Sequence, residues 1–268
     1  MFAGKTIIVT GGGSGIGAAV ARAFAVEGAK VCVADLNLNA ATDVATAIGG
    51  IAMACDVRDE AQIVDLVKKV ETAFGPIDIF FSNAGLARGE PGHAASASTE
   101  VWQLNWDVHV MAHVYAARAV LPGMIERGQG YLVNVASAAG LLNQIGDAAY
   151  SATKHAAVSL AESLAITHKA DGIDVSVVCP QYVATPLLDM DDDSEVGGSL
   201  ISASEVADCV IAGMTAKDFF ILPHPQVADY MALRGTDHAH WLSGMQALRR
   251  KFLHESESGE LGEMYKFV

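Results

Sequence analysis

The chain has 268 residues, 51% of them hydrophobic, which is enough for one large domain or two small ones. Its 17 basic and 31 acidic side chains leave a net charge of −14, which disfavours nucleic acid and anionic membranes as partners because no overall positive field attracts phosphate. No apolar run approaches the roughly 20 residues that cross a bilayer and the first residues lack a secretory signal, so we expect a cytoplasmic protein that does not contact membranes.

Short apolar segments alternate with longer helical patterns over most of the chain. Seven segments are apolar almost throughout, which is typical of parallel strands covered on both faces: 5–10, 30–34, 51–55, 77–81, 131–135, 173–179 and 219–222. Helical patterns lie between them, for example at 17–26, 60–74, 101–127 and 148–169. This alternation predicts an α/β fold, a Rossmann-type doubly wound parallel sheet of about seven strands with helices on both faces.

The end of the chain has a different pattern. Apolar side chains recur there at helical spacing, at Trp241, Leu242, Met245, Leu248 and Phe252. This stripe predicts an amphipathic helix that packs on the domain or on a neighbouring subunit. We find no linker, so we expect one domain: a nucleotide-binding and catalytic part, residues 1–222, and a helical extension, residues 223–268, that contributes to the substrate pocket or to subunit contacts.

A glycine-rich segment follows the first predicted strand and opens the first predicted helix. Its glycines allow a tight turn in which backbone N–H groups and the helix N-terminus approach a pyrophosphate. A bare turn is the alternative, but the position at the start of a βαβ unit favours dinucleotide binding. The candidate cofactor residues of this loop are Gly11, Ser14, Gly15, Ile16 and Gly17.

Asp35 ends the second predicted strand, where a carboxylate can accept hydrogen bonds from the adenosine ribose hydroxyls. The same charge would repel a 2′-phosphate, and positions 14, 36 and 37 hold no Arg or Lys to compensate. We therefore expect NAD rather than NADP as cofactor. Asp35 can also serve as a helix N-cap, which does not exclude contact with the ribose.

Further motifs follow in a fixed order, and together they resemble the short-chain dehydrogenase/reductase family, in its compact single-domain branch, over residues 5–222. Besides the glycine loop, they are Asp56-Val57, Asn83-Ala84-Gly85, Ser137, Tyr150-x-x-x-Lys154 and Pro180-x-x-Val183-x-Thr185. The resemblance implies that the first pair contacts adenine, that the second motif also binds the cofactor, and that the last embraces the nicotinamide. It further implies that Ser137, Tyr150 and Lys154 are catalytic, the last two also contacting the cofactor.

Two positions depart from the family's pattern. His109 stands where the family usually has an Asn that holds a proton-relaying water, so we expect His109 to take part in the relay in its place, and it can titrate near neutrality. Gln181 replaces the usual Gly after Pro180 and is expected to project towards the substrate. His109 and His113 are spaced as metal ligands can be, but no acidic or Cys partner is evident, and we expect no metal.

Oxidation of a secondary alcohol requires a hydride acceptor, here NAD, and a base for the proton. A free Tyr has a pKa of about 10, too high for this task. Lys154 lies one helical turn after Tyr150, so we expect its ammonium, with the nicotinamide's charge, to lower that pKa. Ser137 can donate a hydrogen bond to the substrate oxygen.

The substrate pocket is expected to be mostly apolar with a few polar anchors. Its candidates are Leu141, Leu142, Gln144, Gln181, Leu187, Leu188 and the helix around Trp241. They favour a medium-sized alcohol or ketone, cyclic, steroid-like or aromatic. The acidic run 189–195 predicts a solvated loop that, by the resemblance, forms a lid disfavouring anionic substrates.

Two alternatives to an alcohol dehydrogenase stay open. A catalytically silent NAD-binding protein can have the same fold, although the catalytic residues are intact. A sugar-nucleotide epimerase or dehydratase usually has a different glycine spacing and a larger C-terminal domain. By the resemblance we also expect a homodimer or homotetramer, paired through residues 101–127 and 148–169.

Overall fold

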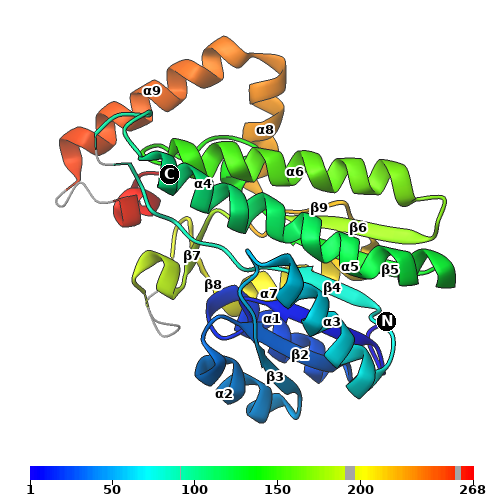
Figure 1. Cartoon of the computed structure of the whole chain (residues 1–268). Helices are drawn as coiled ribbons and strands as arrows, with labels where there is room; N and C mark the ends of the chain where they lie inside the picture. Colours follow the sequence, from blue (N-terminus) through cyan, green and yellow to red (C-terminus); the bar gives the residue numbers. More distant parts are fainter. Residues whose placement is uncertain (91, 191–196, 257–260) are drawn as a thin grey trace.

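Seven parallel strands form the central sheet, in the order β3-β2-β1-β4-β5-β6-β9 (Figure 1). The structure is a computed structural model that describes residues 1–90, 92–190, 197–256 and 261–268. The strands are β1 (Thr6–Thr10), β2 (Lys30–Asp35), β3 (Ile51–Ala54), β4 (Ile79–Ser82), β5 (Gly130–Val135), β6 (Ile173–Val178) and β9 (Phe220–Ile221). The predicted doubly wound sheet is confirmed. Both bounds of each predicted strand lie within two residues of the observed bounds.

Apolar residues place β1 at the centre of the sheet. All five residues of β1 are buried, and Ile8 pairs with Cys32 of β2 on one side and Phe80 of β4 on the other. The strand order reverses between β1 and β4, so the loops after these two strands flank a crevice at the carboxyl edge of the sheet. The glycine loop and Asn83 both lie at this edge.

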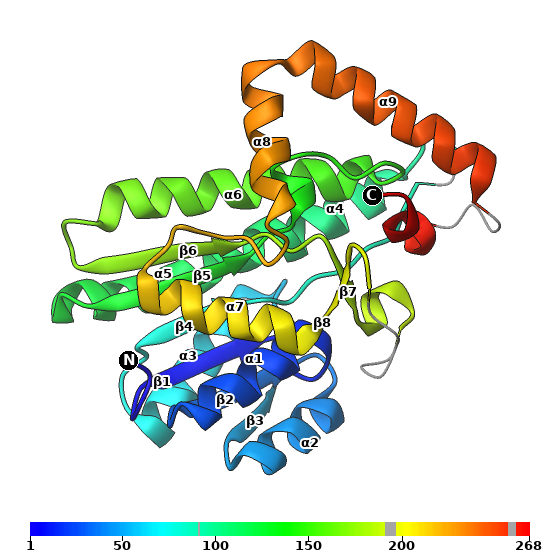
Figure 2. The ribbon, with the colours of Figure 1, turned by 180° about the vertical axis from the view of Figure 1, so that it is seen from behind.

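Helices cover both faces of the sheet (Figures 1 and 2). On one face lie α1 (Gly15–Val26), α2 (Leu38–Ile48) and α7 (Ala203–Ala216). On the other face lie α3 (Glu60–Phe74), α4 (Thr99–Trp106), α5 (Ala112–Arg127) and α6 (Ala148–His168). α2 and α7 are not among the helices that the sequence predicts.

The helix predicted over residues 101–127 is interrupted by a π-helical turn, η1 (Asp107–Met111), between α4 and α5. The backbone N–H of Ala112 donates to the carbonyl of Asp107, five residues back. Such turns insert one extra residue and often occur at functional sites. His109 lies in this turn with its side chain fully buried.

The stretch Thr99–Arg127 is also long and apolar enough to cross a membrane, a property that the sequence prediction did not assign to it. Half of its most apolar window is buried inside the fold. α5 packs on α3, and α4 packs on α6, so this stretch is part of a core layer on the sheet.

The C-terminal extension lies beyond the carboxyl edge of the sheet. Its elements are α8 (Gln226–Thr236), α9 (His238–Glu255) and the 3₁₀ segment η4 (Leu261–Phe267), which returns towards the small sheet of β7 (Tyr182–Ala184) and β8 (Leu200–Ser202) (Figure 2). The predicted amphipathic helix is α9. Trp241 and Phe252 are buried in it, whereas Leu242 is exposed, so only part of the predicted stripe packs inward.

Candidate active site

The glycine loop is shaped by positive φ angles and by close contact with β4. Gly11 and Gly15 have φ of +61° and +49°, which side chains other than glycine rarely adopt. A Cβ on Gly17 would overlap the carbonyl oxygen of Gly11 and the amide of Asn83. The Asn83 amide donates to the carbonyls of Thr10 (3.0 Å) and Gly11 (3.1 Å), so Asn83 holds the loop in place.

Asp35 extends from the end of β2 to the glycine loop. One carboxylate oxygen accepts from the backbone N–H of Gly13 (2.9 Å), and the other accepts from that of Asn37 (2.9 Å). The N-cap of α2 is Asn37, so Asp35 is not a helix cap. Its carboxylate lies beside the loop at the rim of the cleft, where the sequence predicts the ribose contact.

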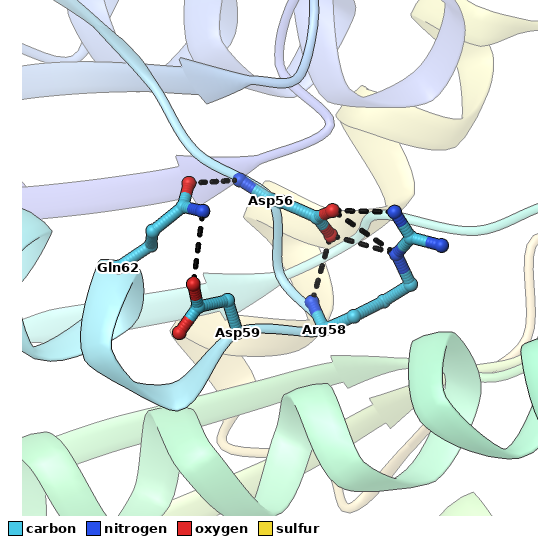
Figure 3. Close-up of polar contacts among 4 residues, drawn as sticks. All are labelled: Asp56, Arg58, Asp59 and Gln62. Atoms are coloured by element: carbon cyan, nitrogen blue, oxygen red, sulfur yellow. Dashed lines mark hydrogen bonds and ion pairs between the residues drawn. The ribbon is translucent and has the colours of Figure 1, made fainter.

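Asp56 and Arg58 both line the cleft and form a bidentate ion pair (Figure 3). The hydrogen bonds from Arg58 lower the pKa of the Asp56 carboxyl. The Gln62 side chain accepts from the Asp56 backbone N–H (2.9 Å) and donates to Asp59 (3.1 Å), the N-cap of α3. Arg58 lines the cleft and is absent from the predicted site.

The three predicted catalytic side chains converge at the carboxyl edge. Ser137 follows β5, donates to the carbonyl of Pro180 (3.3 Å) and lines the same cleft as Tyr150. Tyr150 and Lys154 lie one turn apart on α6, and the Lys154 ammonium nitrogen is 5.5 Å from the Tyr150 ring centroid. Lys154 donates to the carbonyl of Val135 (3.0 Å), which anchors it beneath the site.

The pKa of Tyr150 is raised in this structure, whereas the expected lowering depends in part on the charge of a bound nicotinamide. Burial raises the pKa of Tyr150 to about 12, and the hydrogen bond with Ser137 opposes this only in part. Burial also lowers the pKa of Lys154 to about 8. Removal from water disfavours the charged form of each group, and it is the largest cause of both shifts.

Asp147 is a site residue that the sequence reasoning missed. Its carboxylate caps α6 by accepting from the Tyr150 backbone N–H (3.0 Å) and also accepts from that of Gly89 (2.9 Å). It is buried, with 2% of its surface exposed. An Asp three residues before Tyr150, at the start of a helical pattern, is the N-cap signal that could have identified it.

Hydrogen bonds fix the tautomer of His109. Its Nε2 accepts from the Leu86 backbone N–H (3.2 Å), so Nδ1 carries the proton and donates to Thr153 Oγ1 (3.0 Å). Burial, with the charge of Lys154, lowers the pKa of His109 well below 6.5. The expectation that His109 titrates near neutrality is therefore wrong. Its ring packs edge-on against Tyr150, with centroids 5.3 Å apart.

We expect His109→Asn to keep turnover within about tenfold of the parent, because the uncharged imidazole bridges two protein groups in this arrangement. The shorter amide cannot reach both Leu86 and Thr153, so the free energy of unfolding should fall by about 1 kcal/mol. Denaturation in urea and steady-state rates would measure both effects. A collapse of activity without loss of stability would show that the imidazole itself transfers protons.

His113, four residues after His109, is also buried. Burial lowers the pKa of His113 to about 3. Among the residues that the structure describes, no group of three His, Cys, Asp or Glu side chains is placed to hold a metal ion.

Two cavities meet at Ser137. The larger, about 610 Å³, is the cleft along the carboxyl edge. It is lined by most predicted cofactor residues: Gly11, Ser14, Gly15, Ile16, Asp35, Asp56, Val57, Asn83, Tyr150, Lys154, Pro180, Val183 and Thr185. Gly17 and His109 do not line this cleft. The smaller cavity, about 310 Å³, is lined by Leu142, Trp241, Met245 and Phe267 among others.

Four residues line both cavities: Ser137, Gln144, Gln181 and Tyr182. Leu187 and Leu188, which the sequence assigns to the substrate pocket, line the larger cleft instead. Leu141 lines neither cavity, because it is buried in the core. Of the acidic run 189–195, the structure describes Asp189 and Met190, and residues 191–195 lie outside the described part.

Comparison with known proteins agrees with this geometry. The family model of the short chain dehydrogenases matches residues 5–195. A 2,5-dichloro-2,5-cyclohexadiene-1,4-diol dehydrogenase of Sphingobium indicum is 39% identical over 200 residues, 73% of this chain and 79% of its own. A cyclohexanol dehydrogenase of an Acinetobacter species is 33% identical over 239 residues, 85% of this chain and 94% of its own.

Solved structures give the same result. A short-chain dehydrogenase/reductase from Burkholderia phymatum, crystallised with NAD, has a TM-score of 0.79 and 30% identity, and the match covers 88% of this chain and 94% of that one. The family model spans most of the sheet, the cleft and the predicted catalytic residues. The chain therefore belongs to the short-chain dehydrogenase family and is an oxidoreductase.

Proposed function

We propose that this enzyme interconverts a secondary alcohol and a ketone, with NAD as hydride carrier and Tyr150 as the acid or base. The observation that carries the proposal is the meeting of Ser137, Tyr150 and Lys154 where the cofactor cleft joins a second cavity. NADH formation across a panel of secondary alcohols would test it. Tight NAD binding without turnover of any alcohol would favour a silent binding protein instead.

The cleft fits a dinucleotide. The glycine loop would hold the pyrophosphate at the N-terminus of α1, Asp35 the adenosine ribose, and Asp56 the adenine amino group. Arg58 is engaged by Asp56 rather than free for a 2′-phosphate, which supports NAD over NADP. The relative from Burkholderia phymatum was crystallised with NAD, which supports the same assignment. When bound, NAD⁺ supplies the hydride acceptor and a positive ring.

Each catalytic side chain has a separate task. Ser137 hydrogen-bonds the substrate oxygen and holds it beside the Tyr150 hydroxyl. Tyr150 takes the proton from this oxygen in the oxidative direction and returns it in the reductive direction. Lys154 supplies the positive charge that stabilises tyrosinate, and its bond to the Val135 carbonyl keeps it in place.

The raised Tyr150 pKa makes the direction of catalysis depend on pH. Oxidation needs tyrosinate, whose population grows with pH below the pKa of Tyr150. The value of kcat/KM for alcohol oxidation should therefore rise by about tenfold per pH unit, until the pH reaches the pKa that Tyr150 has with the cofactor bound. Ketone reduction needs the phenol and should fall above that same pKa. Steady-state rates in both directions from neutral to alkaline pH would measure this. A flat oxidative profile would contradict the assignment of Tyr150 as base.

The smaller cavity is the proposed substrate pocket. Its walls are mostly apolar, and many come from the C-terminal extension: Tyr230, Leu233, His240, Trp241, Gly244, Met245, Leu248, Met264, Phe267 and Val268. A medium-sized, largely apolar alcohol, cyclic or aromatic, fits a cavity of about 310 Å³. The name of the Acinetobacter relative, a cyclohexanol dehydrogenase, supports a cyclic alcohol. The extension is therefore proposed to be part of the catalytic domain.

The helices on one face are proposed to pair two or four copies of the chain. Exposed apolar side chains lie on α4, α5 and α6, at Trp106, Ile125 and Ile166. Contact with a second copy would remove them from water. Light scattering would measure the assembly. All four cysteines are free thiols, which supports a reducing, cytoplasmic location.

A further inference from the structure

Gln181 directly follows Pro180, whose carbonyl contacts the Ser137 hydroxyl. The carbonyl of Pro180, directly before it, accepts hydrogen bonds from Ser137 Oγ (3.3 Å) and from the Ala138 backbone N–H (2.8 Å). Gln181 itself lines both cavities. Gln181 therefore borders the place where the reacting carbon of the substrate is proposed to lie, between Ser137 and the cofactor cleft.

The backbone of Gln181 is fixed by a buried histidine. Its N–H donates to His224 Nδ1 (3.1 Å), while His224 Nε2 donates to the carbonyls of Tyr182 (3.1 Å) and Ser199 (3.0 Å). His224 has 2% of its surface exposed. The residue at the cavity junction is thus held from both the strand that follows it and the segment before α8.

One end of the Gln181 amide is held and the other is available. Its Oε1 accepts from Gln226 Nε2 (3.3 Å), at the first residue of α8. Among the residues that the structure describes, the amide nitrogen of Gln181 has no hydrogen-bond partner. Gln144 differs, because it accepts from the Tyr182 hydroxyl (3.4 Å) and donates to the Ile145 carbonyl (3.2 Å). At the junction of the two cavities, Gln181 is therefore the amide whose nitrogen has no protein partner among the described residues.

We propose that Gln181 hydrogen-bonds a second hydroxyl of the substrate, so that the substrate class is a diol on a largely apolar ring. This rests on the proposed function. A hydroxyl can both donate and accept, so it pairs with whichever end of the amide faces the cavity. Oxidation of one carbinol sends a hydride to NAD⁺ and a proton to Tyr150, and it leaves the other hydroxyl intact. The product is a hydroxyketone.

The test compares cyclohexanol with the 1,2-, 1,3- and 1,4-cyclohexanediols, using kcat/KM with NAD⁺. Two equivalent hydroxyls alone give a diol a statistical factor of about two. A hydrogen bond that the mono-alcohol leaves unmade should raise the ratio for at least one diol to roughly tenfold or more. The isosteric variant Gln181→Met should return this ratio to about two.

Two further variants complete the test. Gln226→Met releases one end of the Gln181 amide and should give an intermediate ratio. Gln246→Met, on the exposed face of α9, is the matched control and should keep the parent ratio. Turnover of cyclohexanol with no preference for any diol, or a preference that survives Gln181→Met, would overturn the proposed role of Gln181 and leave the proposed function standing. Failure to turn over every alcohol would instead count against the proposed function.

Discussion

Replacing Tyr150 with Phe is expected to lower kcat for alcohol oxidation by roughly 10²–10⁴-fold, the usual contribution of a positioned acid or base. The hydroxyl is the only group removed, so the edge-on packing against His109 is retained. NAD affinity should change little, because the pyrophosphate and ribose contacts lie elsewhere in the cleft. Stopped-flow measurement of NADH formation, with NAD binding measured by calorimetry, would separate the two effects.

Tyr131→Phe is the matched control for that variant. Tyr131 is also a buried Tyr, and its hydroxyl is hydrogen-bonded to Ser176 (2.8 Å) on the neighbouring strand, away from both cavities. We expect this variant to lose about 1 kcal/mol of stability and to keep turnover near that of the parent. If Tyr150→Phe also retained most of the turnover, Tyr150 would not be the proton acceptor.

Replacing Lys154 with Met is expected to lower kcat by roughly 10²–10³-fold, comparable to the loss of one preorganised electrostatic contact. Burial is the largest cause that raises the Tyr150 pKa to about 12, so nearby positive charge is needed to favour tyrosinate. The Lys154 ammonium is that charge within the protein, and it is almost fully buried. Met has a similar volume, so the core should keep its packing.

The oxidative pH profile reports how Lys154 acts. If its charge assists tyrosinate formation, the rise of the Lys154→Met profile should move to higher pH. Lys169→Met, at an exposed ion pair with Asp174, is the control and should leave the profile unchanged. A Lys154→Met enzyme with parental kcat and an unshifted profile would show that the lysine only fills space.

Much of the fold can be predicted because its signals are local. Each strand of the sheet is a short apolar run, and the glycine loop announces the first βα turn, so strand order and crevice follow from general rules. α7 also has a readable signal that the prediction omits, a capping box formed by Ser202 and Glu205. The π-helical turn at His109 has no such signal in the sequence.

The details of the site depend on contacts between distant segments. Gln181 meets His224 and Gln226, which are 43 and 45 residues away along the chain. No local spacing predicts such contacts. The Tyr150 pKa is a second example, because the helical spacing of Tyr150 and Lys154 indicates attraction, whereas the desolvation that raises this pKa arises from the whole fold.

The most direct test follows the hydrogen that leaves the substrate. A cyclic secondary alcohol deuterated at its carbinol carbon would be incubated with the enzyme and NAD⁺, and the NADH would be analysed by mass spectrometry. Transfer of deuterium to NADH by the parent enzyme, with the rate of transfer reduced roughly 10²-fold or more in Tyr150→Phe, is the expected result. A parent enzyme that binds NAD⁺ but transfers no deuterium from any alcohol tested would contradict alcohol oxidation at this site.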